Sequence, residues 1–410
     1  MPRQASRAKR TLSRAAAFLF AVAISIPAAA YTFNYVVPDM RLPAAQSGGS
    51  ACPVPLRVLT TAGSVNRRWS TVLGASPVTI LTADQTPDGR LNEIENTILE
   101  SFAVWTGVSG STLTPASLAP LARTSTQNAC ASDGANSICF DQSDAAFTPG
   151  VLAFTRVISA DHLGAQLGSG PAATQIGQIL DADIYFNPGD SRTRFATPAA
   201  LASQPSAYDL ESVLTHELGH VFGFSHSAVW SAMLFPYAPA PGTFTGSRPS
   251  AQQPDAPLSD DDRTGLRVLY PDSSDAIHVG EVSGRIIPAN PLSLPDAPAG
   301  VTGIYGAHVV ALDATTGSVI AGTLGGWSCG GAGPAQFDGS FLITRLPVGA
   351  SASYKLYAEP LNGVVDPSTV ANATATVCRN VSTDPGWPAP SSCVVPSVDT
   401  NFTVRIRGTP

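Results

Sequence analysis

The sequence has little charge and few histidines. Charged side chains make up 13 % of the 410 residues, the formal net charge is −7, and histidine occurs six times. Lys and Arg cluster only near the N-terminus, whereas a protein that binds nucleic acid needs a basic surface to neutralise phosphates. We therefore expect no nucleic-acid partner.

Long apolar runs are absent beyond the first 30 residues. A basic stretch precedes an apolar run at 15–26, and three alanines at 28–30 follow as a small-residue cleavage site, which is the pattern of a secretory signal peptide. A retained membrane anchor is the alternative, but the run is shorter than the ~20 residues that span a bilayer. We expect residues 1–30 to be a signal peptide, the protein to be secreted, and no stable membrane insertion after that peptide is removed.

Cysteine is also sparse, and the six cysteines suit an oxidising compartment. Cys130 and Cys139 flank a polar loop, and we expect them to form a disulfide. The sequence leaves open how the other four pair: Cys52, Cys329, Cys378 and Cys393.

One segment concentrates the rare histidines. Residues 216–226 read His-Glu-Leu-Gly-His-Val-Phe-Gly-Phe-Ser-His, the H-E-x-x-H-x-x-G-x-x-H pattern of a zinc site. On a helix, His216 and His220 share one face. Gly223 tolerates a positive φ, so the helix ends there and His226 becomes the third nitrogen ligand. A structural helix with an accidental H-E-x-x-H is the alternative, and the third histidine argues against it.

Glu217 is the expected general base. Three neutral imidazoles leave zinc a position for water, whose pKa the ion lowers to near ~7. A carboxylate beside the ion takes a proton from the water as it attacks a peptide carbonyl, and passes that proton to the leaving amine. The remaining histidines are scattered, and we expect them on the surface or in loops: His162, His278 and His308.

The length permits more than one folded core. Residues 31–64 are rich in Pro, Ala, Gly and Ser without clear periodicity, which predicts a leader or short pro-segment, with folding starting near Arg67. From residue 65 to 271 the pattern mixes strands and helices. The expected strands are 78–81, 151–154 and 182–186, and the expected helices are 91–105, 208–221 and a last one that opens at Ser259.

The composition changes after residue 272. Residues 279–410 carry alternating or β-branched runs separated by turn signals, with almost no helix pattern. This predicts a β-sandwich domain, joined to the first domain by a linker at 272–278. The expected strands are 284–287, 307–312, 341–343 and 354–357.

Residues 208–227 resemble the active-site helix of the matrixins, a family of the metzincin clan of zinc endopeptidases. Residues 258–270 resemble the closing helix of that family, through Leu258 to Asp262, Gly265 and Leu269-Tyr270. The resemblance covers roughly residues 65–271. It implies an α+β catalytic domain, with a twisted sheet above the zinc helix and a cleft between them, ahead of the all-β sandwich.

The family also implies roles for residues near the metal. Met233 would form the methionine turn beneath the zinc, although it is the seventh residue after His226, one earlier than in matrixins; an ordinary core Met is the alternative. Pro236 and Tyr237 fall where the wall of the specificity pocket lies. Asp262 would support the methionine turn, or else be a solvated carboxylate at a helix N-terminus.

The sequence shows no clear ligand pattern for the structural zinc site or for the calcium sites of the family. Phe154 and Tyr185 stand where matrixins have histidines for a structural zinc, so we expect one catalytic zinc ion per chain. Calcium has candidate oxygen ligands in Asp183, Asn187 and Asp190, but surface solvation is the role we expect for these three side chains.

The matrixin propeptide with its cysteine latency motif is missing. Cys52 lies upstream and would either bind the zinc until the leader is removed or pair in a disulfide, which we favour. The C-terminal domain resembles carboxypeptidase regulatory-like and transthyretin-like sandwiches at residues 282–286, 306–311 and 339–343. That resemblance implies a spacer, a folding aid, or attachment to matrix or a cell surface.

Together these features predict a secreted zinc endopeptidase that acts on protein or peptide substrates. One alternative is a non-catalytic extracellular binding or adhesion protein that uses the metalloprotease domain as a scaffold; the intact ligands and base argue against it. A zinc hydrolase of non-peptide amides is the other. Cleavage preference is expected to depend on the loop at 235–245.

Overall fold

The computed structural model describes the backbone of residues 26–27, 33–39, 42–49, 52–58, 69–72, 78–113, 122–124, 130–140, 147–189, 193–230, 232–243, 257–288, 302–329 and 336–360. Side chains are described for all of these except 26–27, 69–72 and 122–124. The expected signal peptide therefore lies outside the described residues, apart from the backbone of two positions. Arg67, Asp190, Cys378 and Cys393 lie outside them as well.

The largest sheet has six strands, in the order β4-β10-β8-β5-β7 with β9 beside β10. Strand β9 runs antiparallel to β10, and the other pairs are parallel. Almost every residue of β10 is buried, as is usual for a strand covered on both faces. The six strands are β4 (Arg57–Val58), β5 (Trp69–Val72), β7 (Ala122–Thr124), β8 (Asn136–Cys139), β9 (Ala153–Ser159) and β10 (Gln178–Phe186).

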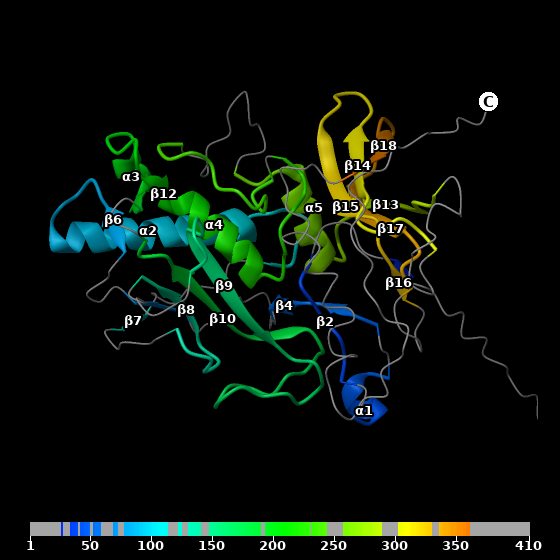
Figure 1. Cartoon of the computed structure of the whole chain (residues 1–410), viewed down its shortest axis with the longest axis horizontal. Coiled ribbons are helices and arrows are strands. Elements are labelled where there is room, and N and C mark those ends of the chain that lie inside the picture. Colours follow the sequence, from blue (N-terminus) through cyan, green and yellow to red (C-terminus); the bar gives the residue numbers. More distant parts are fainter. Residues whose placement is uncertain are drawn as a thin grey trace, which may run out of the picture.

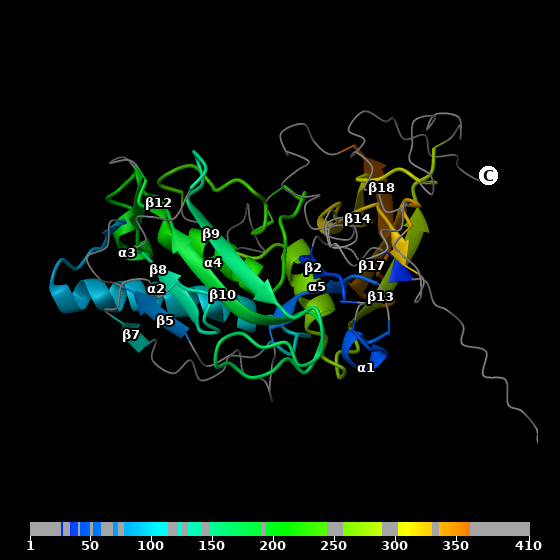
Figure 2. The same cartoon turned by 60° about the horizontal axis from the view of Figure 1, so that its bottom comes forward.

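Helices α2 (Pro87–Thr106) and α4 (Leu210–Val221) pack against each other, and α4 also packs on β9 and β10 (Figures 1 and 2). Helix α2 begins earlier than the expected residue 91 because the Thr86 side chain caps it and proline fits its first turn. One face of α2 is buried, and it is formed by Ile94, Ile98, Phe102 and Trp105. The Trp105 indole N–H donates to the Thr215 carbonyl of α4 at 2.8 Å. This contact fixes the helix that carries the histidine motif.

A small parallel sheet adjoins the start of α4. Its order is β12-β11-β6, formed by Tyr208–Asp209, Arg194–Ala196 and Thr79–Leu81, and the short helix α3 (Pro198–Leu201) follows β11. The expected helix at 208–221 starts two residues late because Tyr208 and Asp209 pair with β11 instead. Asp209 then caps the helix, since its carboxylate accepts from the N–H groups of Glu211 and Ser212.

The N-terminal segment differs most from expectation. Residues 33–58, placed in a leader, are part of the folded core in their described stretches. Phe33 is fully buried with its ring centroid 5.6 Å from that of Phe224, and the Asn34 N–H donates to the Gly223 carbonyl at 2.9 Å. The sequence of this segment shows no clear periodicity because its elements are only two to four residues long. They are β2 (Tyr35–Val36), α1 (Ala44–Ser47), β3 (Val54–Pro55) and β4.

The C-terminal part forms two small antiparallel sheets in its described residues. Strand β13 (His278–Arg285) pairs with β17 (Ser340–Pro347), while β14 (His308–Asp313) lies between β15 (Val319–Leu324) and β18 (Tyr354–Glu359). Strand β16 (Ser328–Cys329) pairs with β1 (Ile26–Pro27). Each expected strand overlaps an observed one, and β15 was missed. Whether residues 279–410 complete a sandwich stays a prediction, because 361–410 lie outside the described residues.

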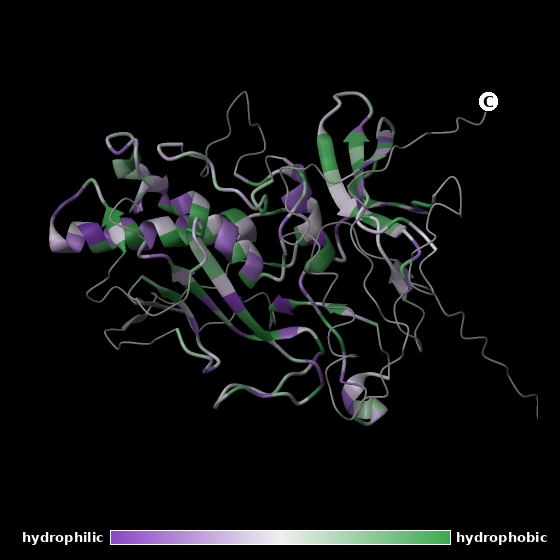
Figure 3. Cartoon of the chain, in the orientation of Figure 1, coloured by the Kyte–Doolittle hydropathy of each residue, from purple (hydrophilic) through white to green (hydrophobic). Residues whose placement is uncertain are grey.

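Helix α5 (Asp260–Leu269) lies between the two parts of the molecule and packs on β15 and β17 (Figures 1 and 2). It starts at the expected Ser259, which forms a capping box with Asp262. Strands β14 and β15 are strongly apolar (Figure 3). No helix in the described part of the chain is both long and apolar enough to cross a bilayer.

Candidate metal centre

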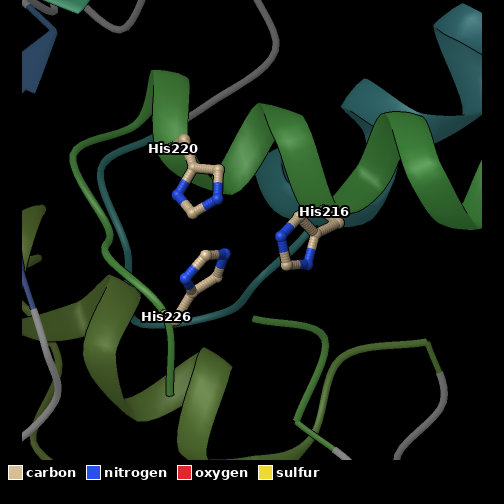
Figure 4. Close-up of side chains that lie close together, drawn as sticks. All are labelled: His216, His220 and His226. Carbon is tan, nitrogen blue, oxygen red and sulfur yellow. The ribbon is translucent and has the colours of Figure 1, made fainter. Parts of the chain in front are cut away.

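The three histidines of the motif converge on one point (Figure 4). One nitrogen from each of His216, His220 and His226 lies within 4.8 Å of the others. Among the residues that the structure describes, this is the one group of at least three potential ligands with that geometry. The three ring centroids are 4.8 to 5.3 Å apart, which leaves room for one ion between the nitrogens.

Backbone carbonyls orient two of the rings. The Nδ1 atom of His216 lies 2.7 Å from the Met233 carbonyl oxygen, and that of His220 lies 3.0 Å from the Phe224 carbonyl oxygen. Because a carbonyl only accepts, each Nδ1 must carry the proton, and each Nε2 keeps its lone pair for a metal. The donor set thus fits a zinc ion bound by three imidazoles.

His216 and His220 are neutral at physiological pH. Burial and the neighbouring His220 lower the pKa of His216 to about 3. Burial also lowers the pKa of His220. A neutral imidazole is the form that binds a metal.

Glu217 is on the same helix and is only 4 % exposed. The Thr155 hydroxyl of β9 lies 2.7 Å from its Oε2 atom. Burial raises the pKa of Glu217 to about 7, and the hydrogen bond from Thr155 acts in the opposite direction. A carboxyl group with a pKa near neutrality can both take and give a proton, which is what a general base and acid requires. No motif in the sequence points to Thr155.

Gly223 ends the helix as expected, with φ at +102°. A second reason for glycine comes from the N-terminal segment, because a Cβ on Gly223 would lie 2.0 Å from the Leu56 carbonyl oxygen. The same segment supports His220, since the Asn34 side chain donates to the Phe224 carbonyl at 2.7 Å. Residues 33–58 therefore brace the turn that brings His226 back.

Two residues of the turn beneath the site, Met233 and Leu234, share the supporting role that was predicted for Met233 alone. Met233 provides the backbone carbonyl that binds His216, and its side chain is partly buried. The side chain that packs on the zinc helix belongs to Leu234, because a Cβ added to Gly219 would lie 2.7 Å from Leu234 Cδ2. Leu234 is the eighth residue after His226, the position that the family pattern assigns to methionine.

Asp262 is 1 % exposed, so it is not the solvated carboxylate offered as one alternative. Its Oδ2 accepts from the Met233 N–H at 2.7 Å, and its Oδ1 accepts from the Leu234 N–H at 3.2 Å. It also accepts from the backbone and hydroxyl of Ser259. The carboxylate thus joins the start of α5 to the turn beneath the metal site.

Aromatic side chains follow the third histidine. Tyr237 is 51 % exposed and Pro236 is half-buried. The ring of Phe235 lies 5.7 Å from that of Tyr237 and 5.0 Å from that of Trp230, centroid to centroid. Trp230, which the sequence reasoning did not single out, is 73 % exposed.

The remaining polar candidates have other partners. The expected surface role of Asp183 is wrong: its side chain is fully buried and accepts from Arg156 at 3.0 Å. The Asn187 side chain donates to the Val151 carbonyl, which precedes β9, and accepts from the Gly189 N–H in its own loop. His162 and His278 each pair with a nearby aspartate. His308 is buried in β14, not in a loop or on the surface.

Two disulfides occur in the described residues. Cys130 pairs with Cys139, as expected from the loop between them. Cys52 pairs with Cys329, across 277 positions of sequence. This pairing ties the N-terminal segment to the C-terminal sheets and leaves no thiolate at Cys52 to bind a metal.

Comparisons with known proteins agree with this geometry. Residues 159–271 match the family model described as Matrixin. Metalloendoproteinase 1 of Glycine max is 34 % identical over 110 residues, 27 % of this chain and 30 % of that protein. Metalloendoproteinase 1-MMP of Arabidopsis thaliana is 35 % identical over 99 residues, 22 % of this chain and 24 % of that protein. The match spans less than a third of the length of either relative.

Proposed function

Because this chain contains a matrixin-like metzincin domain, we propose that it is a secreted zinc endopeptidase that hydrolyses peptide bonds in protein substrates. The observation that carries the proposal is the convergence of three imidazoles beside a buried carboxylate. The family match and the names of the two relatives support the reaction class. Secretion rests on the N-terminal sequence pattern.

The residues divide the chemistry among them. His216, His220 and His226 would hold the ion, which when bound supplies the Lewis acid that makes water and a peptide carbonyl reactive at neutral pH. Glu217 takes a proton from the attacking water and delivers it to the leaving amine. The Thr155 hydroxyl orients that carboxylate. The exposed aromatic side chains beyond His226 offer apolar contacts to a substrate.

Casein hydrolysis by the secreted protein, with and without a zinc chelator, tests the proposal. We expect Glu217→Ala to retain zinc and lose turnover, since the base is removed and the ligands stay. We expect His220→Ala to lose both zinc and turnover. The matched control is Glu100→Ala, an exposed glutamate on α2, which should behave as the wild type.

Retained proteolysis in Glu217→Ala would refute the role of the base. If the wild type binds zinc but hydrolyses no protein, a panel of small amides separates a non-peptide hydrolase from a non-catalytic protein. Inactivity towards both substrate classes would favour the binding or adhesion alternative, with the C-terminal sheets as the attachment surface.

A further inference from the structure

Ser227, directly after the third histidine, is buried and held by three hydrogen bonds. Its hydroxyl donates to Asp261 Oδ2 at 2.7 Å and accepts from the Val229 N–H at 3.1 Å. Its own N–H donates to the Leu234 carbonyl at 2.8 Å. These bonds fix the backbone next to His226. Of the three partners of Ser227, only Asp261 belongs to another element, helix α5.

The other oxygen of Asp261 is bound by the C-terminal part of the chain. The Gly322 N–H of β15 donates to Asp261 Oδ1 at 2.7 Å, and the carboxylate is only 2 % exposed. A buried carboxylate is costly unless each oxygen has a partner. Strand β15 therefore completes the hydrogen bonding of the group that anchors the metal-binding loop.

Gly322 lies directly against that loop. A Cβ added there would be 2.6 Å from Val229 Cγ2 and 2.7 Å from His308 Nε2. His308 is itself 6 % exposed, and its Nδ1 lies 3.2 Å from Glu359 Oε1 of β18. The sheet β15-β14-β18 thus presents a closely fitted surface to residues 227–229.

We propose that strands β14 and β15 position the third metal ligand, through the Gly322 amide, the Asp261 carboxylate and the Ser227 hydroxyl. The inference rests on the proposed function and deepens it: the C-terminal part is an outer support of the metal site, not only a spacer or attachment module. Groups that hydrogen-bond to a metal ligand set its orientation, and mutating one typically costs about 10- to 100-fold in metal affinity or activity. The bonds of Ser227 act one step further out, through the backbone next to His226. Asp261 and Gly322 are positioning residues, since neither touches the metal site itself.

The test uses the full chain and two variants on opposite sides of the contact. Ser227→Ala removes the hydroxyl link, and Gly322→Ala pushes a methyl group into Val229 and His308. Lys355→Ala is the control, because this exposed side chain of β18 does not face the loop. Zinc affinity is measured by competition with a chromophoric chelator, and ligand geometry by the visible spectrum of the cobalt(II)-substituted protein. The kinetic constants kcat and KM are determined separately, and thermal unfolding is recorded for each variant.

We expect both variants to bind zinc at least about tenfold more weakly, with an altered cobalt spectrum and a fall in kcat larger than any change in KM. Lys355→Ala should match the wild type. Unchanged zinc affinity and cobalt spectrum in Ser227→Ala overturn the proposal, even if its melting temperature falls. That variant decides alone if Gly322→Ala does not fold. Metal affinity and spectrum need no proteolysis, so they remain readable if the proposed activity fails.

Discussion

At the scale of single residues, the metal site depends on hydrogen bonds that fix which nitrogen of each ring is available. The carbonyls of Met233 and Phe224 hold the Nδ1 protons of His216 and His220. Thr155 does the corresponding work for Glu217. None of these three partners is a ligand or a base. The two carbonyls leave Nε2 of each ring free for a metal ion, and Thr155 orients the carboxylate that would accept a proton.

Thr155→Val tests the partner of the base. The variant keeps the shape of the side chain and removes the hydroxyl, so the charged form of Glu217 loses a hydrogen bond and the pKa of Glu217 rises further. Because the base must be ionised to accept a proton, we expect the acidic limb of the kcat/KM profile to move to higher pH. Peptide hydrolysis across pH measures this. Thr174→Val, at an exposed position on a loop, is the control. An unmoved acidic limb in Thr155→Val would contradict the role of Glu217 as the base that Thr155 orients.

At the scale of elements, helix α4 depends on what meets it at each end. Asp209 caps its start, and after its end the chain turns back at Gly223 against the Leu56 carbonyl. Helix α5 supports the metal site through its N-terminal turn, where two adjacent aspartates accept hydrogen bonds from different segments. Asp262 binds the turn at Met233, and Asp261 binds Ser227 and β15.

Gly223→Ala tests the turn. The substitution forces a side chain into φ +102° and places its Cβ 2.0 Å from a backbone oxygen. Gly150→Ala is a matched control, since Gly150 has φ +88° with nothing within 4 Å of an added Cβ. We expect the control to cost about 1–2 kcal/mol of unfolding free energy. Gly223→Ala should cost clearly more and also weaken zinc binding, as measured by urea unfolding and metal content; equal costs would show that the contact with Leu56 is not tight.

At the scale of the whole molecule, three stretches distant in sequence are joined. Phe33, Asn34 and Leu56 contact the turn that follows α4, and the Cys52–Cys329 disulfide fastens their segment to the C-terminal sheets. Helix α5 lies between those sheets and α4 (Figure 1). Tyr35 adds an aromatic contact to Trp327, with centroids 5.7 Å apart. The described N-terminal stretches therefore belong to the folded unit.

Replacing Cys52 and Cys329 together by serine tests this joining. A disulfide stabilises mainly by restricting the unfolded chain, and the effect grows with loop length. We expect the double variant to lose about 2–5 kcal/mol of unfolding free energy. The Cys130→Ser/Cys139→Ser pair should lose less, because it closes a loop of only 9 positions. Denaturant unfolding compares the two, and a smaller loss in the long-range pair would mean that packing alone holds the N-terminal segment.

The sequence by itself determined the chemistry of the centre. The spacing of His216, Glu217 and His220 is set by the period of one helix, and the next turn brings back His226, so local geometry is enough. The long helices were predicted near their observed places for the same reason, and so were several strands, among them β9, β10, β14 and β17. The disulfide that closes a short loop was predicted as well.

Only the tertiary structure decided what surrounds that centre. Three contacts between different elements illustrate this. Leu234 packs against α4, Leu56 lies against Gly223, and Gly322 donates a hydrogen bond to Asp261. Such contacts depend on how strands and helices pack, and no local period in the sequence records that packing. The N-terminal segment was taken for a leader because short, irregular pieces of chain carry no periodic signal, although the completed fold buries them.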